Sequence, residues 1–374
     1  MSVGYKIHNK SSKPNNIVEK ENKILDQCAA IENELPYFLI DYFIYLKNAI
    51  AITSRLAYLQ DLLFFCKYLV NETRITTAET TDAITEKEFA SIRARDVNRF
   101  IGDYCTRYFI EKDNTTVLME NHNRSLSRKK SSLSVLFKFL FREEIMKDNI
   151  VDGLNPIKLP KPQPDAIKRL EVEEVALMLQ AVETGQGLTD KERQYWEKTK
   201  YRDKAILVLF TTFGLRLKEL QQLNISSFSF SRNEFKIYRK RGKEIDMPLN
   251  NSVVKAINDY IELERPKETE LDDEFKDALF LSMQKKRITE RAIRQLVKKY
   301  TSIALGTSRD SGYSPHKLRA TAASSLIQYG FSIYDVQNLL DHDNVTTTQL
   351  YSAHRKNAKR DIIKQYELLD EEEN

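Results

Sequence analysis

Proline is distributed unevenly along this sequence of 374 residues, and its densest stretch separates two different regions. Four of the nine prolines lie between residues 156 and 164. Because proline fixes φ and favours extended backbone, we expect a semi-rigid linker over residues 152–168. A chain of this length can fill two hydrophobic cores. We therefore predict a flexible, polar N-terminus over residues 1–23, a first domain over residues 24–151 and a second over residues 169–374.

Hydrophobic periodicity predicts helices on the N-terminal side of the linker. Apolar residues return every three or four positions over residues 53–70 and 94–109, and an aromatic-rich segment over residues 35–47 precedes them. The clearest stripe runs over residues 133–141, where apolar side chains stand at i, i+3, i+4, i+7 and i+8. A threonine-rich segment over residues 73–85 is poor in large apolar residues and is predicted to be a loop. These patterns together predict a helical bundle.

The C-terminal side of the linker combines helices with a short hairpin. A helix is expected near residues 172–182, and a strongly apolar helix over residues 203–212 would end at Gly214. Residues 235–238 and 244–248 have the character of two short strands joined by a basic turn. We therefore expect a mainly α protein whose second domain is mixed, mostly helical with a small antiparallel sheet.

The net charge is only slightly basic, 59 − 54 = +5, so a nucleic-acid surface must come from local clusters. Such clusters lie at the start of one helix, in the turn between the two strands, and on a helix that begins after Thr289. The candidate DNA contacts are Arg124, Arg128, Lys129, Lys130, Arg239, Arg241, Lys243, Arg291 and Arg294. Three basic clusters favour a long polyanion as partner, and helix starts bind phosphate through free N–H groups. The alternative is a plain bundle with solvated basic faces.

The sequence disfavours several classes of protein. Cys28, Cys66 and Cys105 lack metal-ligand spacing and have the character of buried thiols in a reducing compartment. Ten glycines leave little room for a glycine-rich phosphate loop. We find neither a signal peptide nor an apolar run of membrane length. We therefore expect a cytoplasmic protein without a membrane span or a cysteine metal site.

Side chains suited to phosphate chemistry gather near the C-terminus. His316 and Arg319 are three residues apart behind Pro315, which suits the first position of a helix, so both would leave the same helix face. His342 and Tyr351 follow 26 and 35 residues after His316. Arginine grips two phosphate oxygens, histidine transfers protons near neutral pH, and a phenol can attack phosphorus. For each residue taken alone, an ordinary structural side chain is the favoured interpretation, so the rest of the chain must decide.

Five local motifs together resemble the tyrosine recombinase family. They are Arg216 in GLRLKEL, Lys240 in the basic turn before MPL, His316 and Arg319 in SPHKLRA, His342 in LLDHDNV and Tyr351 in TTTQLYS. The nine-residue step from His342 to Tyr351 is similar to the Xer-type and transposon-integrase branch. The resemblance covers nearly the whole chain. The part before the linker resembles the helical core-binding domain, which binds DNA, and the part after it resembles the catalytic domain.

The resemblance assigns roles to the residues that would touch the phosphate. Tyr351 would attack a DNA phosphodiester and form a 3′-phosphotyrosyl link with a free 5′-hydroxyl. Arg216 and Arg319 would clamp the two non-bridging oxygens and stabilise the charge that builds at phosphorus. His342 would form a hydrogen bond to the same phosphate.

It also assigns the proton transfers. An unperturbed phenol has a pKa near 10, so it needs help to attack at neutral pH. His316 would accept the tyrosine proton or position the group that does. Lys240 would protonate the leaving 5′-oxygen, with Lys243 as the second candidate for that acid. Glu219, one turn after Arg216, would orient the site from behind.

The same resemblance implies the partners. A phosphotyrosyl bond conserves the energy of the phosphodiester, so neither ATP nor a metal is required. Strand exchange between two duplexes needs four active sites, so we expect double-stranded DNA with paired half-sites and a tetramer on DNA. Accessory proteins are compatible with this chemistry. A last helix over residues 361–369 would dock on the neighbouring subunit, and packing on its own domain is the alternative.

The sequence departs from the family at two positions and leaves some roles open. Ala320 stands where histidine is common, Asp341 stands where glycine is common, and the segment around Trp196 is an insertion relative to compact members. Neither substituted position is a reacting group, so we expect activity to survive. Two alternatives are relaxation of supercoils, as by a type IB topoisomerase, and DNA binding without catalysis. Within recombinases, chromosome dimer resolution and the integration or excision of a mobile element both remain open.

Overall fold

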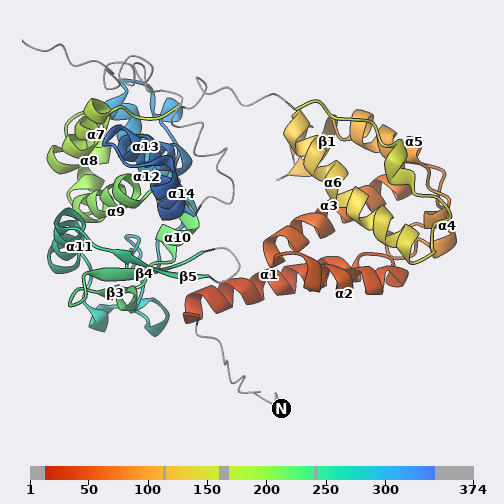
Figure 1. Cartoon of the computed structure of the whole chain (residues 1–374), viewed down its shortest axis with the longest axis horizontal. Coiled ribbons are helices and arrows are strands. Elements are labelled where there is room, and N and C mark those ends of the chain that lie inside the picture. Colours follow the sequence, from red (N-terminus) through yellow and green to blue (C-terminus); the bar gives the residue numbers. More distant parts are fainter. Residues whose placement is uncertain (1–12, 113–114, 160–167, 240–242, 342–374) are drawn as a thin grey trace, which may run out of the picture. The chain divides into compact units, whose positions relative to one another are not determined.

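The computed structural model describes residues 13–112, 115–159, 168–239 and 243–341. The chain forms two compact units, Met1–Lys161 and Pro162–Asn374 (Figure 1). Most described residues lie in helices, and the strands form two small antiparallel sheets. This confirms the expected mainly α fold. Within the described part of the chain, none of the helices has the length and apolar character needed to cross a membrane.

The N-terminal unit is a helical bundle that carries one hairpin. Its elements are α1 (Asn15–Asn33), η1 (Tyr37–Leu39), α2 (Ile40–Ala49), α3 (Ile52–Glu72), α4 (Glu86–Ala90), α5 (Ala94–Arg99), the π-helical turn η2 (Phe100–Tyr104), β1 (Arg107–Lys112), β2 (Thr115–Glu120), α6 (Asn123–Arg142) and η3 (Ile150–Gly153). Aromatic rings fill its core. The ring centroid of Phe65 on α3 lies 4.9 Å from that of Phe100 on η2 and 6.0 Å from that of Phe137 on α6. The apolar stripes of α3 and α6 therefore face a common core.

Two smaller expectations for this unit are confirmed. The loop predicted over residues 73–85 lies between α3 and α4. Cys28, Cys66 and Cys105 are buried and carry free thiols. Burial raises the pKa of the Cys66 thiol, and it raises the pKa of Cys105 to about 12. These thiols therefore remain protonated near neutral pH and behave as small apolar side chains.

Helix α1 begins earlier than the polar N-terminal sequence suggested. We expected flexible chain over residues 1–23, but the helix starts at Asn15, directly after Pro14. Proline fixes φ at a value that suits entry into a helix, and φ of Pro14 is −56°. Ile17 in the first turn is buried, so tertiary packing helps to stabilise the polar start of this helix.

The helix predicted over residues 94–109 is wrong beyond Tyr104. After η2 the chain forms the antiparallel hairpin β1–β2. The Tyr108 ring lies 4.9 Å from the Phe64 ring of α3, so the hairpin packs against the side of the bundle. The sequence did carry a signal, because the Asp113-Asn114 pair between the strands is a typical turn dipeptide.

The predicted linker begins later than residue 152. Leu154 is buried in the core of the N-terminal unit. Asn98 on α5 donates a hydrogen bond from Nδ2 to the Gly153 carbonyl (3.0 Å), and its Oδ1 accepts one from the Asn155 backbone N–H (2.8 Å). An asparagine that satisfies both backbone groups holds this stretch on the bundle. The first residues of the proposed linker over 152–168 therefore belong to the N-terminal unit.

The C-terminal unit is mostly helical around a small sheet. Its elements are α7 (Val172–Thr184), α8 (Asp190–Trp196), α9 (Lys200–Phe213), α10 (Leu217–Gln221), η5 (Ile225–Ser227), β3 (Phe228–Ser229), β4 (Glu234–Tyr238), β5 (Glu244–Pro248), α11 (Asn251–Leu263), η7 (Glu268–Glu270), η8 (Asp273–Phe275), α12 (Glu290–Ala304), η9 (Arg309–Ser311), α13 (Pro315–Gln328) and α14 (Ile333–Leu340). The strands follow the order β3-β4-β5 and are antiparallel. The predicted hairpin is confirmed as β4 and β5, whereas β3 was not predicted.

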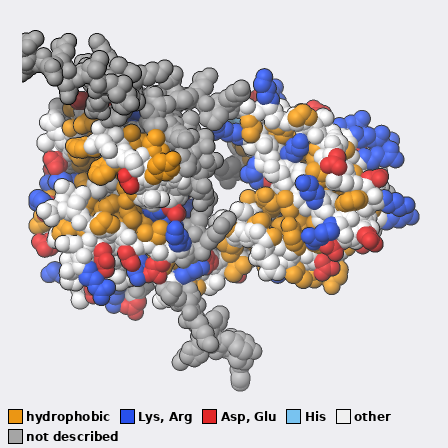
Figure 2. All heavy atoms as spheres, in the orientation of Figure 1, with side chains coloured by type: hydrophobic (Ala, Val, Ile, Leu, Met, Phe, Trp, Pro, Cys, Tyr) orange, Lys and Arg blue, Asp and Glu red, His pale blue; other side chains and the backbone are white. Residues whose placement is uncertain are grey.

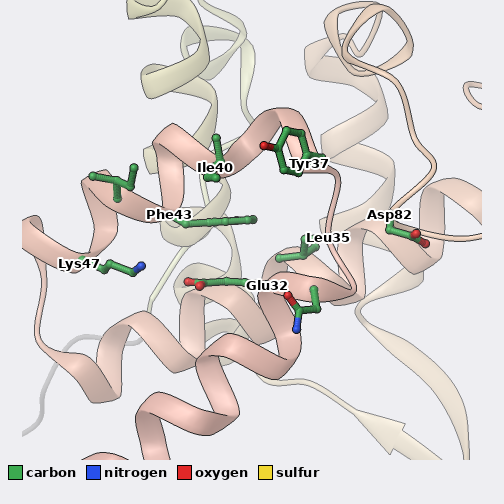
Figure 3. A pocket seen from close by; sticks show the side chains of 9 residues that line it. Glu32, Leu35, Tyr37, Ile40, Phe43, Lys47 and Asp82 are labelled. Carbon is green, nitrogen blue, oxygen red and sulfur yellow. The ribbon is translucent and has the colours of Figure 1, made fainter.

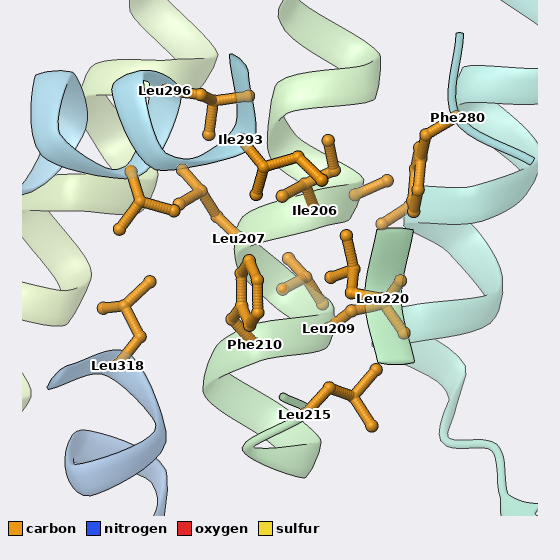
Figure 4. Close-up of a cluster of buried hydrophobic side chains, with 14 of the residues drawn as sticks. Ile206, Leu207, Leu209, Phe210, Leu215, Leu220, Phe280, Ile293, Leu296 and Leu318 are labelled. Atoms are coloured by element: carbon orange, nitrogen blue, oxygen red, sulfur yellow. The ribbon is translucent and has the colours of Figure 1, made fainter. Parts of the chain in front are cut away.

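Helix α9 runs through the centre of this unit. Residues Ala205 to Phe210 are buried without interruption, so the helix is covered on all sides. Figure 4 shows side chains of α9, among them Leu207 and Phe210, facing Ile293 of α12 and Leu318 of α13. The apolar helix predicted over residues 203–212 is therefore confirmed, and it is the element against which the helices of the candidate site pack.

The segment around Trp196, described above as an insertion, is part of the core. Trp196 at the end of α8 is buried, and its indole Nε1 donates a hydrogen bond to the Val182 carbonyl of α7 (2.7 Å). Arg309 donates from Nε and Nη2 to the two carboxylate oxygens of Glu192, each at 2.9 Å. Helix α8 is thus held to α7 and to the segment before α13, and its role is structural.

Candidate active site

Arg216 lies at the sharp junction between α9 and α10. Gly214 ends α9 in the left-handed conformation with φ of 57°, and Arg216 is the N-cap of α10. Glu219 accepts from the Arg216 backbone N–H at Oε2 and from its Nη1 at Oε1, both at 2.8 Å. Glu219 is buried, whereas the Arg216 side chain is about one-third exposed. The carboxylate therefore fixes the guanidinium while leaving part of it accessible.

Arg319 enters the same region from α13. Pro315 is the first residue of this helix, as predicted, and Arg319 one turn later is buried. Its Nη1 donates to the Gly214 carbonyl at 2.6 Å, and its Nη2 donates to the Leu340 carbonyl. A Cβ atom at Gly214 would lie 2.7 Å from Leu340 Cδ2 and 3.5 Å from Arg319 Cγ. Glycine is therefore required both for the left-handed turn and for the close approach of α13 and α14.

Three arginines converge on the C-terminal end of α14. Arg239, directly after β4, donates from Nη2 to the Leu339 carbonyl (2.7 Å). Arg319 donates to the Leu340 carbonyl, and Arg216 donates from Nη2 to the backbone carbonyl of Asp341 (3.0 Å). The last carbonyls of a helix have no N–H partner within it, and they carry the negative end of the helix dipole. The end of α14 therefore gathers guanidinium groups from three distant parts of the chain, immediately before His342 in the sequence.

Asp341 adds a carboxylate to this cationic cluster. It caps α14 in the left-handed conformation, with φ of 51° and ψ of 57°. Its Oδ1 accepts a hydrogen bond from Lys243 Nζ at 3.2 Å, and its Oδ2 lies 3.6 Å from Arg239 Nη1. Partial burial alone would raise the pKa of Asp341, but the hydrogen bond from Lys243 and the charge of Arg239 outweigh burial and lower it. The carboxylate is therefore ionised at neutral pH.

His316 lies in the first turn of α13 with its side chain exposed. Desolvation by the surrounding protein lowers the pKa of His316, and the charges of Lys317 and Arg319 lower it further. The imidazole is consequently neutral near pH 7, which is the form that can accept a proton.

Several predicted site residues lie outside the described residues: Lys240, Arg241, His342, Tyr351 and the helix expected over residues 361–369. The structure does describe residues close to Lys240 and His342 in the sequence. Arg239 and Lys243 flank Lys240 in sequence, and the Arg239 backbone N–H donates to the Lys243 carbonyl at 2.8 Å. Asp341 directly precedes His342.

One predicted DNA contact in the N-terminal unit is wrong. Lys129 is buried, with its Nζ 3.2 Å from Asp61 Oδ1 and 4.8 Å from the centre of the Phe64 ring. Asp61 is itself buried and also accepts from Arg128, whose side chain is partly exposed, and from the Ser132 hydroxyl (3.1 Å). Lys129 therefore neutralises an internal carboxylate instead of facing a partner.

The other basic residues near the start of α6 differ in their exposure and in their hydrogen bonds. Arg124 is exposed in the first turn. Lys130 donates from Nζ to the Asn155 carbonyl at 2.7 Å and to that of Leu154 at 3.3 Å, so it helps to hold the segment after η3. Of these side chains, Arg124 is the one whose position best fits a phosphate contact.

Arg239 also differs from its expectation as a surface DNA contact. Its side chain is only 1 % exposed, because it points to the C-terminal end of α14, where it binds the Leu339 carbonyl. Lys243 is exposed but bonded to Asp341. On α12, Arg291 and Arg294 are exposed, and Arg294 pairs with Glu290 at 3.1 Å. The α12 residues remain candidates for DNA contact.

Helix α5 supplies basic residues that the sequence analysis missed. Arg93, Arg95 and Arg99 are exposed on or just before this short helix. Figure 2 shows Lys and Arg side chains gathered over one edge of the N-terminal unit, in the region that Figure 1 labels α4 and α5. These arginines are visible in the sequence, but we interpreted their segment only as a helix, on the basis of its apolar residues, and assigned it no DNA contact.

A pocket in the N-terminal unit shares no residue with this site. It has a volume of about 420 Å³ and is lined by Glu32, Asn33, Leu35, Tyr37, Ile40, Phe43, Ile44, Lys47 and Asp82 (Figure 3). None of the predicted catalytic residues belongs to it. The candidate active site is instead the polar cluster at the end of α14.

This chain is similar to known proteins both in sequence and in fold. The model of the phage integrase family matches residues 168–358. The tyrosine recombinase XerC of Natranaerobius thermophilus is 33% identical over 251 residues, which cover 66% of this chain and 78% of that protein. The tyrosine recombinase XerD of Staphylococcus epidermidis is 28% identical over 248 residues, again 66% of this chain and 78% of the relative.

Solved structures share the fold at lower identity. The XerH site-specific recombinase bound to its difH substrate, in a pre-cleavage complex, has a TM-score of 0.57 and 17% identity, covering 92% of this chain and 94% of that one. The integrase of the Tn1549 transposon, in complex with a circular intermediate DNA, has a TM-score of 0.57 and 16% identity, covering 90% and 99%. At these identities the likeness concerns the architecture.

Proposed function

The chain belongs to the phage integrase family, and from this premise we propose that it is a site-specific DNA recombinase that cuts and rejoins strands through a covalent tyrosine intermediate. The observation that carries the proposal is the convergence of Arg216 and Arg319 at the end of α14. The two guanidiniums bind the carbonyls of Leu340 and Asp341, the two residues before His342 in the sequence. Tyr351 follows nine residues after that histidine. A cationic cluster of this kind fits one bridging phosphate of DNA.

The proposed cleavage step exchanges one phosphoester bond for another. The phenolic oxygen of Tyr351 forms a bond to phosphorus, and the bond from phosphorus to the 5′-oxygen breaks. Arg216 and Arg319 stabilise the negative charge on the non-bridging oxygens as the transition state forms. His342 donates a hydrogen bond to the same phosphate. The products are a 3′-phosphotyrosyl link and a 5′-hydroxyl end.

Two proton transfers accompany this exchange. The phenol, with an unperturbed pKa near 10, must lose its proton as it attacks. His316 is accessible, and its lowered pKa keeps the imidazole neutral, so it is suited to accept that proton or to orient the acceptor. Lys240 gives a proton to the leaving 5′-oxygen. Glu219 holds Arg216 from behind through its two hydrogen bonds.

Rejoining reverses these steps. The phosphotyrosyl bond conserves the phosphodiester energy, so a 5′-hydroxyl of a second duplex can displace Tyr351. Exchange of both strands between two duplexes requires four cleavages and therefore four protein copies. We propose that the partners are double-stranded DNA with paired half-sites and further copies of this chain, with residues 361–369 docking on a neighbouring subunit.

We assign DNA binding to the predicted first domain, residues 24–151, and catalysis to residues 169–374. Support comes from the exposed arginines of α5 and α6 in the first and from the arginine cluster in the second. A substrate on the chromosome agrees with a cytoplasmic, nucleoid-associated protein. Chromosome dimer resolution and movement of a mobile element are both compatible with this chemistry.

The central experiment is to trap the covalent complex. The wild-type protein is incubated with nicked DNA substrates drawn from a random library, and the adducts are isolated and sequenced. We expect an adduct at a defined sequence that Tyr351→Phe cannot form. Binding without any adduct would indicate a non-catalytic DNA-binding protein. Relaxation of a plasmid that lacks the recovered sequence would instead favour a topoisomerase.

A further inference from the structure

Arg239 is a buried cation of the candidate site that the proposed cleavage chemistry does not use. Its side chain is 1 % exposed, so it is not placed to touch DNA. Its Nη2 donates a hydrogen bond to the Leu339 carbonyl at 2.7 Å. Among the described residues, its Nε and Nη1 are buried and find no hydrogen-bond acceptor. One nitrogen therefore anchors the guanidinium to the end of α14, and the other two face the groups beside it.

Two carboxylates lie next to these nitrogens. Glu219 Oε1 is 3.9 Å from Arg239 Nε, and Asp341 Oδ2 is 3.6 Å from Arg239 Nη1. Both separations are too long for a hydrogen bond, so the attraction is between charges, and it is strengthened where water is excluded. Burial lowers the pKa of Arg239, the charge of Arg216 lowers it further, and these two carboxylates oppose both effects. Arg239 therefore acts on Glu219 and Asp341 mainly through its charge.

The Glu219 oxygen nearest to Arg239 also holds the clamp arginine. Its Oε1 accepts from Arg216 Nη1, and its Oε2 accepts from the Arg216 backbone N–H, both at 2.8 Å. Glu219 is buried, whereas the Arg216 side chain is about one-third exposed. A buried carboxylate needs a counter-charge inside the protein. If Arg216 were the only cation beside Glu219, the carboxylate would neutralise much of the positive charge that Arg216 has to offer a phosphate.

We propose that Arg239 is a positioning residue for Arg216. By balancing part of the Glu219 charge, it lets Glu219 orient the Arg216 guanidinium and still leaves that guanidinium able to stabilise the charge on the phosphate. Arg239 touches neither the DNA nor the reacting atoms in this role. Arg319 is held by the Gly214 and Leu340 carbonyls, so its action on the phosphate is independent of this link. The inference rests on the proposed recombinase function and deepens it.

The test separates the charge of Arg239 from its hydrogen bond. Arg239→Gln removes the charge and Arg239→Lys keeps it, while both retain a donor for the Leu339 carbonyl. Arg239→Met is a second neutral variant that keeps the buried space filled. The rate of adduct formation through Tyr351 is measured in single turnovers at saturating DNA, on nicked duplexes of the recovered target sequence. DNA affinity and urea unfolding are measured for every variant.

Arg265→Gln is the matched control. Arg265 also binds backbone carbonyls, donating from Nη2 to those of Lys276 (2.6 Å) and Ala278 (3.1 Å). Its Nε is likewise buried without an acceptor among the described residues. The variant therefore removes a similar guanidinium from the same unit without touching Glu219 or the clamp, and it should form adducts at the wild-type rate even where it lowers stability.

We expect both neutral variants, Arg239→Gln and Arg239→Met, to slow adduct formation by about tenfold, a size typical of coupling within one charged network. DNA affinity should stay near that of the wild type, because Arg239 is buried. Arg239→Lys should recover most of the rate, because it keeps the charge beside Glu219. In a Glu219→Gln background, Arg239→Gln should cause no further slowing. In an Arg319→Lys background it should again slow the reaction by about tenfold.

Several results would overturn the inference while leaving the recombinase function intact. Wild-type rates for both neutral variants would remove Arg239 from the mechanism. The same slowing in the Glu219→Gln background would show that Arg239 acts on the fold or on the end of α14. A lysine variant as slow as the glutamine variant would show that the charge is not what matters. Weaker DNA binding with an unchanged saturated rate would make Arg239 a DNA contact. If the wild type forms no adduct through Tyr351, the proposed function fails and this inference fails with it.

Discussion

Arg216 and Arg319 donate hydrogen bonds to consecutive carbonyl oxygens, those of Asp341 and Leu340. The two arginines belong to different helices, and they meet only because α9, α13 and α14 pack around the Gly214 turn. One helix end therefore sets the separation of the two guanidiniums that we assign to the DNA phosphate. This arrangement leads to testable consequences for catalysis, stability and DNA binding.

Replacing either clamp arginine by lysine should slow cleavage although the charge is kept. We expect Arg216→Lys and Arg319→Lys each to reduce the rate of adduct formation by about 10²-fold at saturating DNA. A single ammonium lacks the planar fork that can hold a helix carbonyl and a phosphate oxygen together. The rate is measured with nicked DNA in single-turnover conditions. Arg232→Lys, at an exposed arginine between β3 and β4 that we assign to no DNA contact, is the control and should be near wild type. Wild-type rates for both clamp variants would contradict the assigned roles.

Gly214 should tolerate alanine much less well than another glycine of the same conformation. A Cβ atom at Gly306, where φ is 61°, would have no neighbour within 4 Å among the described residues, whereas at Gly214, where φ is 57°, it would meet Leu340 at 2.7 Å. We expect Gly306→Ala to cost about 1–2 kcal/mol from the left-handed backbone alone. Gly214→Ala should cost about 1–3 kcal/mol more from overpacking, and it should also slow cleavage. Urea unfolding and adduct formation measure the two effects, and equal losses for both variants would argue against close packing at Gly214.

The ion pair that holds α8 should make stability depend on pH in the acid range. The hydrogen bond from Arg309 holds the pKa of Glu192 down at about 2, with the helix N-cap at Thr189 contributing. A carboxyl whose pKa is lower in the folded state stabilises the fold above its unfolded pKa of about 4.3, and that stabilisation is lost as pH falls toward 2. Glu192→Gln should therefore destabilise the C-terminal unit by about 1–3 kcal/mol at pH 7, after allowance for partial exposure.

Urea unfolding of wild type and Glu192→Gln at pH 7 and at pH 3 measures this dependence. The difference between the two proteins should shrink markedly at pH 3. Glu197→Gln is the matched control, because its pair with Lys200 is solvent-exposed, and it should change stability little. A difference for Glu192→Gln that is the same at both pH values would contradict the assigned ion pair.

Lys129 and Arg124 on α6 should separate stability from DNA binding. Lys129→Ala should lower the free energy of unfolding by about 1–3 kcal/mol, because Asp61 loses one of its buried partners. Arg124→Ala should leave stability unchanged, weaken DNA binding, and reduce the slope of log affinity against log salt by about 1. Urea unfolding and binding titrations at several salt concentrations provide the readouts. A wild-type salt slope for Arg124→Ala would remove it from the DNA contacts.

Local sequence signals were sufficient where one residue decides the backbone. Gly214 ends α9, Pro315 opens α13, and Thr289 caps α12 through the Ala292 N–H at 3.1 Å. Each effect depends on a few neighbouring residues, so it is visible without knowledge of the fold. The hairpin formed by β1 and β2 was missed although its turn dipeptide is visible in the sequence, whereas the contact of Tyr108 with Phe64 of the bundle is not.

By itself, the order of residues determined which helices and strands form in most of the chain, and it pointed to the motifs to which we assign the chemistry, because periodicity, caps and motif spacing are local properties. Only the tertiary structure decided how the cations are used. Lys129 neutralises a buried carboxylate, Arg239 turns inward, and Asp341 meets the cations of a distant turn. Charge in a linear sequence is the same for every lysine and arginine. Burial and the distance to a counter-charge give each one its function, and both depend on packing between segments far apart in the chain.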